Sequence, residues 1–206
     1  MKKLSFIILG LVVFAGVLFA QFTNKQERVE AATTTLSTNV LEYLTFSLTS
    51  GDTVPFGDLT PGTPIAAPSS GTVGSVTTNS ANGYTIGLSD GSGTNSALLH
   101  TDTTTYIPDY AGTIAVPTTW TGVGVGISLF AADTSKEAKW GSGTTYDDSS
   151  NKYAGVPAAA TTAHTVTGYH EGADTSSWAF KIDVANSQKT GAYSGDVTFT
   201  ATATLI

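Results

Sequence analysis

The stretch from Ser194 to Ile206 constrains the fold of this chain more than any other. Apolar residues occupy every second position from Val197 to Leu205, and Thr residues alternate with them on the opposite face. This period of two is typical of a β-strand with one buried and one solvated face. An isolated strand cannot bury its apolar face, so other strands must supply neighbours. We expect this strand to be paired on both sides, because its Thr face carries no charge that would deter pairing, and an N-terminal strand is the leading candidate for one neighbour.

The same alternation recurs through the rest of the chain, separated by turns rich in Gly, Pro and Asn. Alternating stretches occupy residues 33–49, 72–78, 84–89, 120–130 and 178–184, and a shorter strand is predicted at residues 54–59. The Asn82-Gly83 pair between two of these stretches predicts a β-hairpin. Residues 136–139 could form at most one helical turn. The pattern predicts an all-β protein, an antiparallel β-sandwich with Greek-key or jelly-roll connections.

Glycines alternate with Val123, Val125 and Ile127 in one of these predicted strands. Gly124 and Gly126 lie on the face opposite to the apolar residues. A glycine in a strand interior often marks the close approach of other atoms. We therefore expect something to cover this outer face.

The N-terminus has the layout of a secretory signal peptide. Lys2 and Lys3 precede an apolar run from Leu4 to Ala20, and small residues stand at Val29–Ala31 in the −3 and −1 positions of a cleavage site after Ala31. This division gives a signal peptide over residues 1–31 and one sandwich domain over residues 32–206. Cleavage after Ala20, or retention of the segment as the only membrane contact, stays open. We expect the protein to be secreted and displayed at the cell surface.

The charge balance excludes one class of partner. Loss of residues 1–31 removes four basic and two acidic residues, which leaves five Lys, no Arg, fourteen acidic residues and a net charge of −9. Five scattered Lys offer no grip on phosphates, so we expect no nucleic-acid partner. The chain has no Cys, so the fold must rest on a core rather than on disulfides.

No residue pattern points to catalysis, and we expect no enzyme and no obligatory cofactor. The three histidines, His100, His164 and His170, lack metal-ligand spacing and are interpreted as surface residues. Oxygen-rich loops at Asp147-Asp148 and residues 90–95 leave a Ca²⁺ site open, although the calcium pattern of an EF-hand is absent.

Loop aromatics suggest a second kind of site. Trp140 lies in a Gly-containing loop close to Tyr146, and this pair is the candidate platform for stacking on a glycan. The alternative is that these rings are buried in the core, as aromatic rings commonly are.

The chain resembles a group of uncharacterised secreted β-sandwich proteins of candidate-phylum bacteria. The resemblance covers Leu44 to Ile206 and rests on motifs at residues 59–64, 76–79, 82–85, 152–157 and 191–195. Residues 19–25 are also similar to the signal-peptide exit of the camelysin/TasA biofilm-fibre family, with Asn24 where that family usually has an acidic residue. The first resemblance implies no activity, and the second implies fibres that assemble by lending an N-terminal strand to the next subunit.

These observations favour a structural role. The segment from Thr33 to Val40 alternates as a strand does, and its residues Thr33, Leu36, Thr38 and Val40 form a candidate strand donor for the sheet of a neighbour. The alternative is that the segment pairs within its own subunit. We therefore expect a surface structural protein that assembles with itself or with other envelope components, or else an adhesive carbohydrate-binding module.

Overall fold

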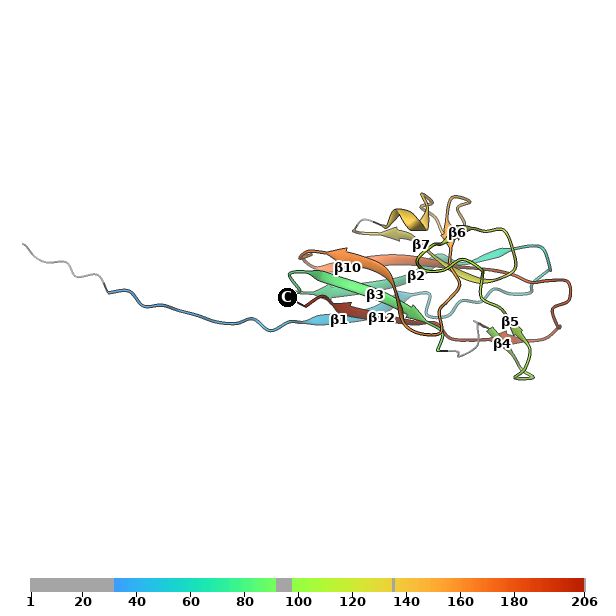
Figure 1. The fold of residues 1–206 in the computed structure, drawn as a ribbon, viewed down its shortest axis with the longest axis horizontal. Coiled ribbons are helices and arrows are strands. Elements are labelled where there is room, and N and C mark those ends of the chain that lie inside the picture. The colour runs from blue at the N-terminus through green and yellow to red at the C-terminus, as the bar shows by residue number, and fades with distance from the viewer. Residues whose placement is uncertain (1–31, 92–97, 135, 206) are drawn as a thin grey trace, which may run out of the picture. The chain divides into compact units, whose positions relative to one another are not determined.

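Strands make up nearly all the regular structure of this chain (Figure 1). The computed structural model describes residues 32–91, 98–134 and 136–205. The strands are β1 (Leu44–Ser50), β2 (Ile65–Thr78), β3 (Gly83–Ser89), β4 (Leu98–His100), β5 (Tyr106–Ile107), β6 (Thr118–Thr119), β7 (Gly124–Ala132), β8 (Lys152–Tyr153), β9 (Thr161–Thr167), β10 (Ala173–Asp183), β11 (Tyr193–Ser194) and β12 (Thr198–Ala203). Within these residues, one 3₁₀ turn, η1 (Ala138–Trp140), is the helical element.

Two main sheets pack face to face. One has the order β1-β2-β10-β7 and the other the order β12-β3-β9, and every ladder in both is antiparallel. After β2 the chain passes repeatedly from one main sheet to the other. Two small sheets, β11-β4-β5 and β6-β8, are built from the connections. The all-β, antiparallel sandwich predicted from the alternation is therefore confirmed.

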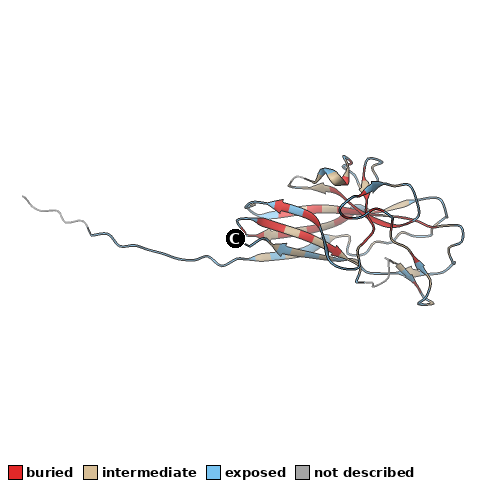
Figure 2. Cartoon of the chain, in the orientation of Figure 1, coloured by how far each residue is buried: buried red, intermediate tan, exposed pale blue. Residues whose placement is uncertain are grey.

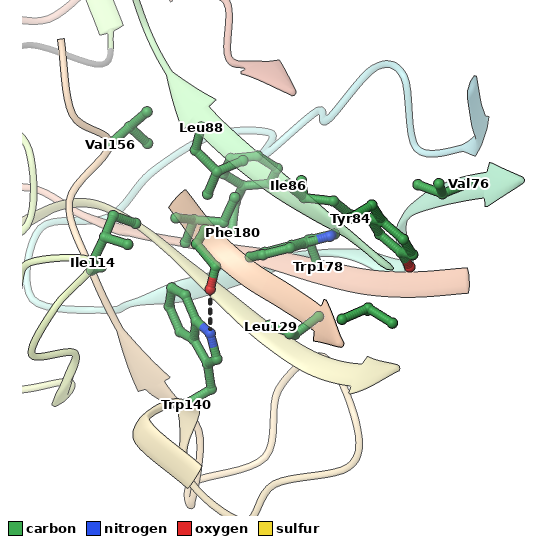
Figure 3. Packing of buried hydrophobic residues seen from close by; sticks show 14 residues of the cluster. Val76, Tyr84, Ile86, Leu88, Ile114, Leu129, Trp140, Val156, Trp178 and Phe180 are labelled. Atoms are coloured by element: carbon green, nitrogen blue, oxygen red, sulfur yellow. Dashed lines mark hydrogen bonds between the residues drawn. The ribbon is translucent and has the colours of Figure 1, made fainter. Parts of the chain in front are cut away.

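The core between the sheets is built from the inward residues of both. Ile86 and Leu88 of β3 face Leu129 of β7 and Trp178 of β10, all of them fully buried (Figure 3). The buried positions alternate along the strands, as Figure 2 shows. A second cluster of Ile107, Val125, Ile182 and Val184 extends the core beneath the small sheet.

The Asn82-Gly83 turn does not close a hairpin. β2 belongs to one main sheet and β3 to the other, so the turn carries the chain across the sandwich. At the end of β2, the Thr78 hydroxyl donates to the carbonyl of Tyr43, the residue before β1, at 2.7 Å. Val76 and Tyr84 are both buried, because each points into the space between the sheets. The predicted hairpin was wrong for this reason.

Three other predictions about strands also need correction. β1 starts only at Leu44, and residues 32–43 contain no strand. The predicted strand at residues 54–59 is a loop. β12 is only six residues long and pairs with β3 alone among the described residues, so it is an edge and not a strand with two partners.

The outer face of β7 is covered, as its glycines predicted. A Cβ atom on Gly126 would lie 3.0 Å from the ring of Trp120 and 3.2 Å from Tyr153. Trp120 stacks on Tyr110 with ring centroids 4.3 Å apart. Gly126 therefore lets this aromatic layer pack closely on the strand, and a side chain at this position would press against the layer.

Candidate functional site

One side of the sandwich, formed by β7 and β9, is closed by the chain's own connections. The free edge of β7 exchanges two backbone hydrogen bonds between Ile127 and Ala154, at 2.7 and 2.9 Å, and is further bonded by the segment around Pro108. The free edge of β9 is closed by side chains. The indole of Trp140 donates to the carbonyl of Ala163 at 3.1 Å. We call this the closed side.

Glu137 completes the closed side. One of its carboxylate oxygens accepts from the backbone N–H of Thr165, and the other lies 2.8 Å from Nδ1 of His164. Burial opposes ionisation of Glu137, but the hydrogen bond and charge of His164 outweigh it, so the pKa of this carboxyl is lowered. The carboxylate therefore acts as a charged cap on a sheet edge.

The opposite side, formed by β1 and β12, is open. β1 pairs only with β2 and β12 only with β3 in the part of the chain that the structure describes. The two strands lie beside each other without forming a ladder (Figure 1). Neither contains a charged residue or a proline, the usual devices that prevent an edge from pairing with another chain. This is the open side.

Apolar side chains remain partly uncovered along the open side. Phe46, Phe199 and Ala201 pack against the core while staying partly exposed. Gly74 makes room for Phe46, because a Cβ atom there would lie 2.9 Å from its ring. Figure 2 shows β1 and β12 as alternating tan and pale blue, unlike the buried red of the strands behind them.

A groove of about 170 Å³ lies where β1 ends and β12 begins. Its apolar lining includes Leu48, Val54, Phe56, Val197 and Phe199. The groove shares several lining residues with a wider cleft of about 890 Å³, which runs between the loops at residues 52–61 and 188–196. We call this end of the open side the groove end.

The opposite end of the open side is held by the turn at residues 79–82. The amide of Asn79 accepts from the N–H of Tyr43 at 2.6 Å and donates to the carbonyl of Leu41 at 2.9 Å. The Ser80 hydroxyl donates to the carbonyl of Thr204 at 2.7 Å, and the Asn82 amide donates to that of Leu205. One turn thus secures the start of β1 and the end of β12. We call this the turn end.

The candidate strand donor contains no strand. Thr33, Leu36, Thr38 and Val40 are exposed, with Leu36 91% and Val40 78% accessible. The chain divides between Val40 and Leu41 into two units, so these residues belong to a different unit from the sandwich. The signal peptide predicted at residues 1–31 lies outside the described residues.

The candidate glycan platform does not exist as predicted. Trp140 is fully buried and meets Trp178 edge to face at a centroid distance of 5.7 Å (Figure 3). Its ring therefore has no face for a sugar, and the interpretation of Trp140 as a free loop aromatic is wrong. Tyr146 is half-buried, and its carbonyl lies 3.5 Å from the hydroxyl of Tyr153.

The interpretation of the histidines as surface residues is wrong for two of the three, since only His170 is partly exposed. His164 is fully buried and His100 nearly so, so neither is a surface residue. His100 accepts at Nδ1 from the backbone of Asp102 and contacts the carbonyl of Thr190 through Nε2. Lys189, through its hydrogen bond, lowers the pKa of Asp102 more than any other contact. These contacts tie β4 to the segment before β11.

The oxygen-rich loop at residues 147–148 bonds its own backbone. The Asp148 carboxylate accepts from the N–H groups of Ser150 and Thr144 at 2.8 and 3.3 Å. Across the described residues, no three His, Cys, Asp or Glu side chains are placed to hold a metal ion. Part of the second candidate Ca²⁺ loop, residues 92–95, lies outside the described residues.

Comparison with known proteins gives no relative. No family model, curated protein or solved structure matches this chain. Within the described segments, no helix has the length and apolar character needed to cross a membrane.

The alternation pattern did not predict the open side, although the sequence contains one signal for it. Alternation alone cannot distinguish an edge strand from a central one, because both have one buried face. The absence of charge and proline from β1 and β12 marks both as able to pair. What the sequence could not supply is that both edges fall on the same side of the sandwich.

Proposed function

We propose that this protein is a secreted structural component of the cell surface whose copies assemble by strand pairing at the open side. The observation that carries the proposal is the contrast between the two sides of the sandwich. The chain covers the edges of β7 and β9 with its own backbone and with Trp140 and Glu137. It leaves the edges of β1 and β12 without a partner among the described residues.

The partner in this proposal is the segment from Thr33 to Val40 of a second copy. We call this segment the arm. Its alternation puts Leu36 and Val40 on one face and small polar residues on the other, which matches an edge with a partly uncovered apolar interior. The arm has no charge, so it brings no buried ion into the pairing.

Backbone pairing and apolar burial both favour this association. Each backbone hydrogen bond contributes about 0.5–1.5 kcal/mol net. Each fully buried Leu or Val side chain adds about 1.5–3 kcal/mol. Ordering the arm opposes both, at about 1–2 kcal/mol for each backbone residue, so assembly is expected to depend on protein concentration.

The test is the oligomeric state of the mature protein, measured by light scattering and negative-stain microscopy over a range of concentrations. We expect polymers from residues 32–206 and a folded monomer after deletion of residues 32–40. Particles that stay monomeric at every concentration would contradict the proposal.

A matched pair of variants separates strand pairing from unspecific adhesion. The double substitution Leu36→Ser and Val40→Ser removes the apolar face of the arm and should abolish polymers. The double substitution Thr35→Ser and Ser37→Thr alters only the opposite face and should leave them intact. Equal loss in both variants would mean that the alternation of the arm plays no part.

A further inference from the structure

We infer that the arm of one copy runs antiparallel to β12 of the next copy, with Val40 at the groove end, so that the copies join head to tail in an open chain of one polarity. This inference rests on the proposed function, and it adds the direction of the arm, the strand it pairs with and the form of the assembly.

The first step concerns where the arm starts. Residues 41–43 are fixed to Asn79 by hydrogen bonds from both its side chain and its backbone. The arm is joined directly to Leu41, so it begins at the turn end of its own sandwich. No linker separates Val40 from the residue that Asn79 holds.

The second step concerns where an arm is needed. The groove lies at the other end of the open side, where Val197 and Phe199 line it together with Asp52 and Asp196. The turn end, in contrast, is already occupied by the bonds of Ser80 and Asn82 to the residues after β12. The groove, with its partly buried apolar lining, thus lies at the groove end.

The third step fits the arm to β12. Its eight residues extend about 27 Å, and the six residues of β12 about 20 Å, at about 3.4 Å per residue. The arm can therefore pair along the whole of β12 and still reach the groove. If Val40 lies opposite Val197, then Asn39 lies opposite Thr198 and Leu36 opposite Ala201.

The distribution of apolar residues in the arm selects the direction. In the antiparallel direction, Val40 lies over the groove and Leu36 over the middle of β12. In the parallel direction, the polar residues Thr33 and Thr34 would cover the apolar groove. Antiparallel pairs are also slightly more stable per residue than parallel ones.

The direction determines the form of the assembly. An antiparallel arm brings the turn end of one copy to the groove end of the next, and the same contact repeats without closing. A parallel arm would bring two turn ends together, where two copies could exchange arms and close as a dimer.

Engineered cysteine pairs test the direction directly, because the chain has no native Cys. One variant carries Asn39→Cys and Thr198→Cys, a pair that the antiparallel direction brings within disulfide range. The second carries Asn39→Cys and Thr202→Cys, which only the parallel direction brings together. Each single substitution serves as a control. After mild oxidation the products are separated on a non-reducing gel.

We expect the first variant to give a ladder of covalent multimers and the second to give none beyond its single-substitution controls. Cross-linking of the second variant into dimers would overturn the inferred direction. Polymers that form in both variants without any disulfide would overturn it too. Neither result would contradict strand pairing itself. Absence of both cross-links and polymers would instead contradict the proposed function itself.

Discussion

The closed and open sides of this sandwich differ in what covers their edge strands, and the two edges of one sheet show this most directly. β9 and β12 are both Thr-rich edges of the same sheet, and each pairs with β3. Trp140 and Glu137 bond the free edge of β9, whereas β12 has no second ladder in the described chain. The comparison teaches that the chain contains the means to close an edge and uses them on one side.

The largest expected effect is on the closed side. Trp140→Ala removes a fully buried ring and its bond to Ala163, and should cost about 3–5 kcal/mol in the free energy of unfolding. Phe199→Ala, on the open side, removes a ring that is only partly buried and should cost about 1–2 kcal/mol. Urea denaturation of both variants checks the order. A larger loss from Phe199→Ala would break the comparison.

Glu137→Gln should give the next largest effect, because it removes the charged cap on β9. We expect a loss of about 1–3 kcal/mol at neutral pH. The lowered pKa of Glu137 means that its contribution is present above the ordinary Glu range and is lost as the pH falls through the folded-state value. The wild type should therefore lose stability in acid more steeply than Glu137→Gln does.

Thermal unfolding across an acid pH series measures this difference. Glu171→Gln is the control, since Glu171 is an exposed acid on the connection between β9 and β10. Its effect should stay within about 0.5 kcal/mol at every pH. If the wild type and Glu137→Gln lose the same stability as the pH falls, the charge of Glu137 does not stabilise the edge of β9.

Asp109→Asn should stabilise the closed side by a smaller amount. Burial, with the nearby charge of Asp90, raises the pKa of Asp109 to about 6. The folded state then holds its proton more tightly than the unfolded chain, so stability falls as the pH rises from about 4 to about 6. The asparagine variant should lack this fall and be about 1–2 kcal/mol more stable at pH 7, after allowance for partial exposure. A variant less stable than the wild type at pH 7 would contradict this.

The smallest expected effect is that of the arm on folding. The double substitution Leu36→Ser and Val40→Ser should change the unfolding free energy of the monomer by less than about 0.5 kcal/mol, because both side chains are exposed. Dilute samples, in which assembly is absent, are required for the measurement. A marked loss would mean that the arm packs on its own sandwich.

The sequence predicted the fold class well because alternation reports directly on one buried face per strand. It predicted pairing poorly, since pairing depends on contacts between distant residues. Asn82-Gly83 indicated a hairpin, yet the turn's side chains bond residues that are distant in the sequence, Tyr43 and Leu205. The burial of Trp140 was equally hidden, because its partners Ala163 and Trp178 lie far along the chain.

The turn at residues 79–82 gives the proposed chain of copies a particular mechanical behaviour. Tension that reaches a sandwich through its arm enters at Leu41, beside Asn79, and is directed along β1. Because β1 and β2 form an antiparallel ladder from Leu44 onward, a pull along the strand axis loads many backbone hydrogen bonds together instead of opening them one at a time. The turn would thus keep residues 41–43 in place under tension, while the β1–β2 ladder carries the force in shear.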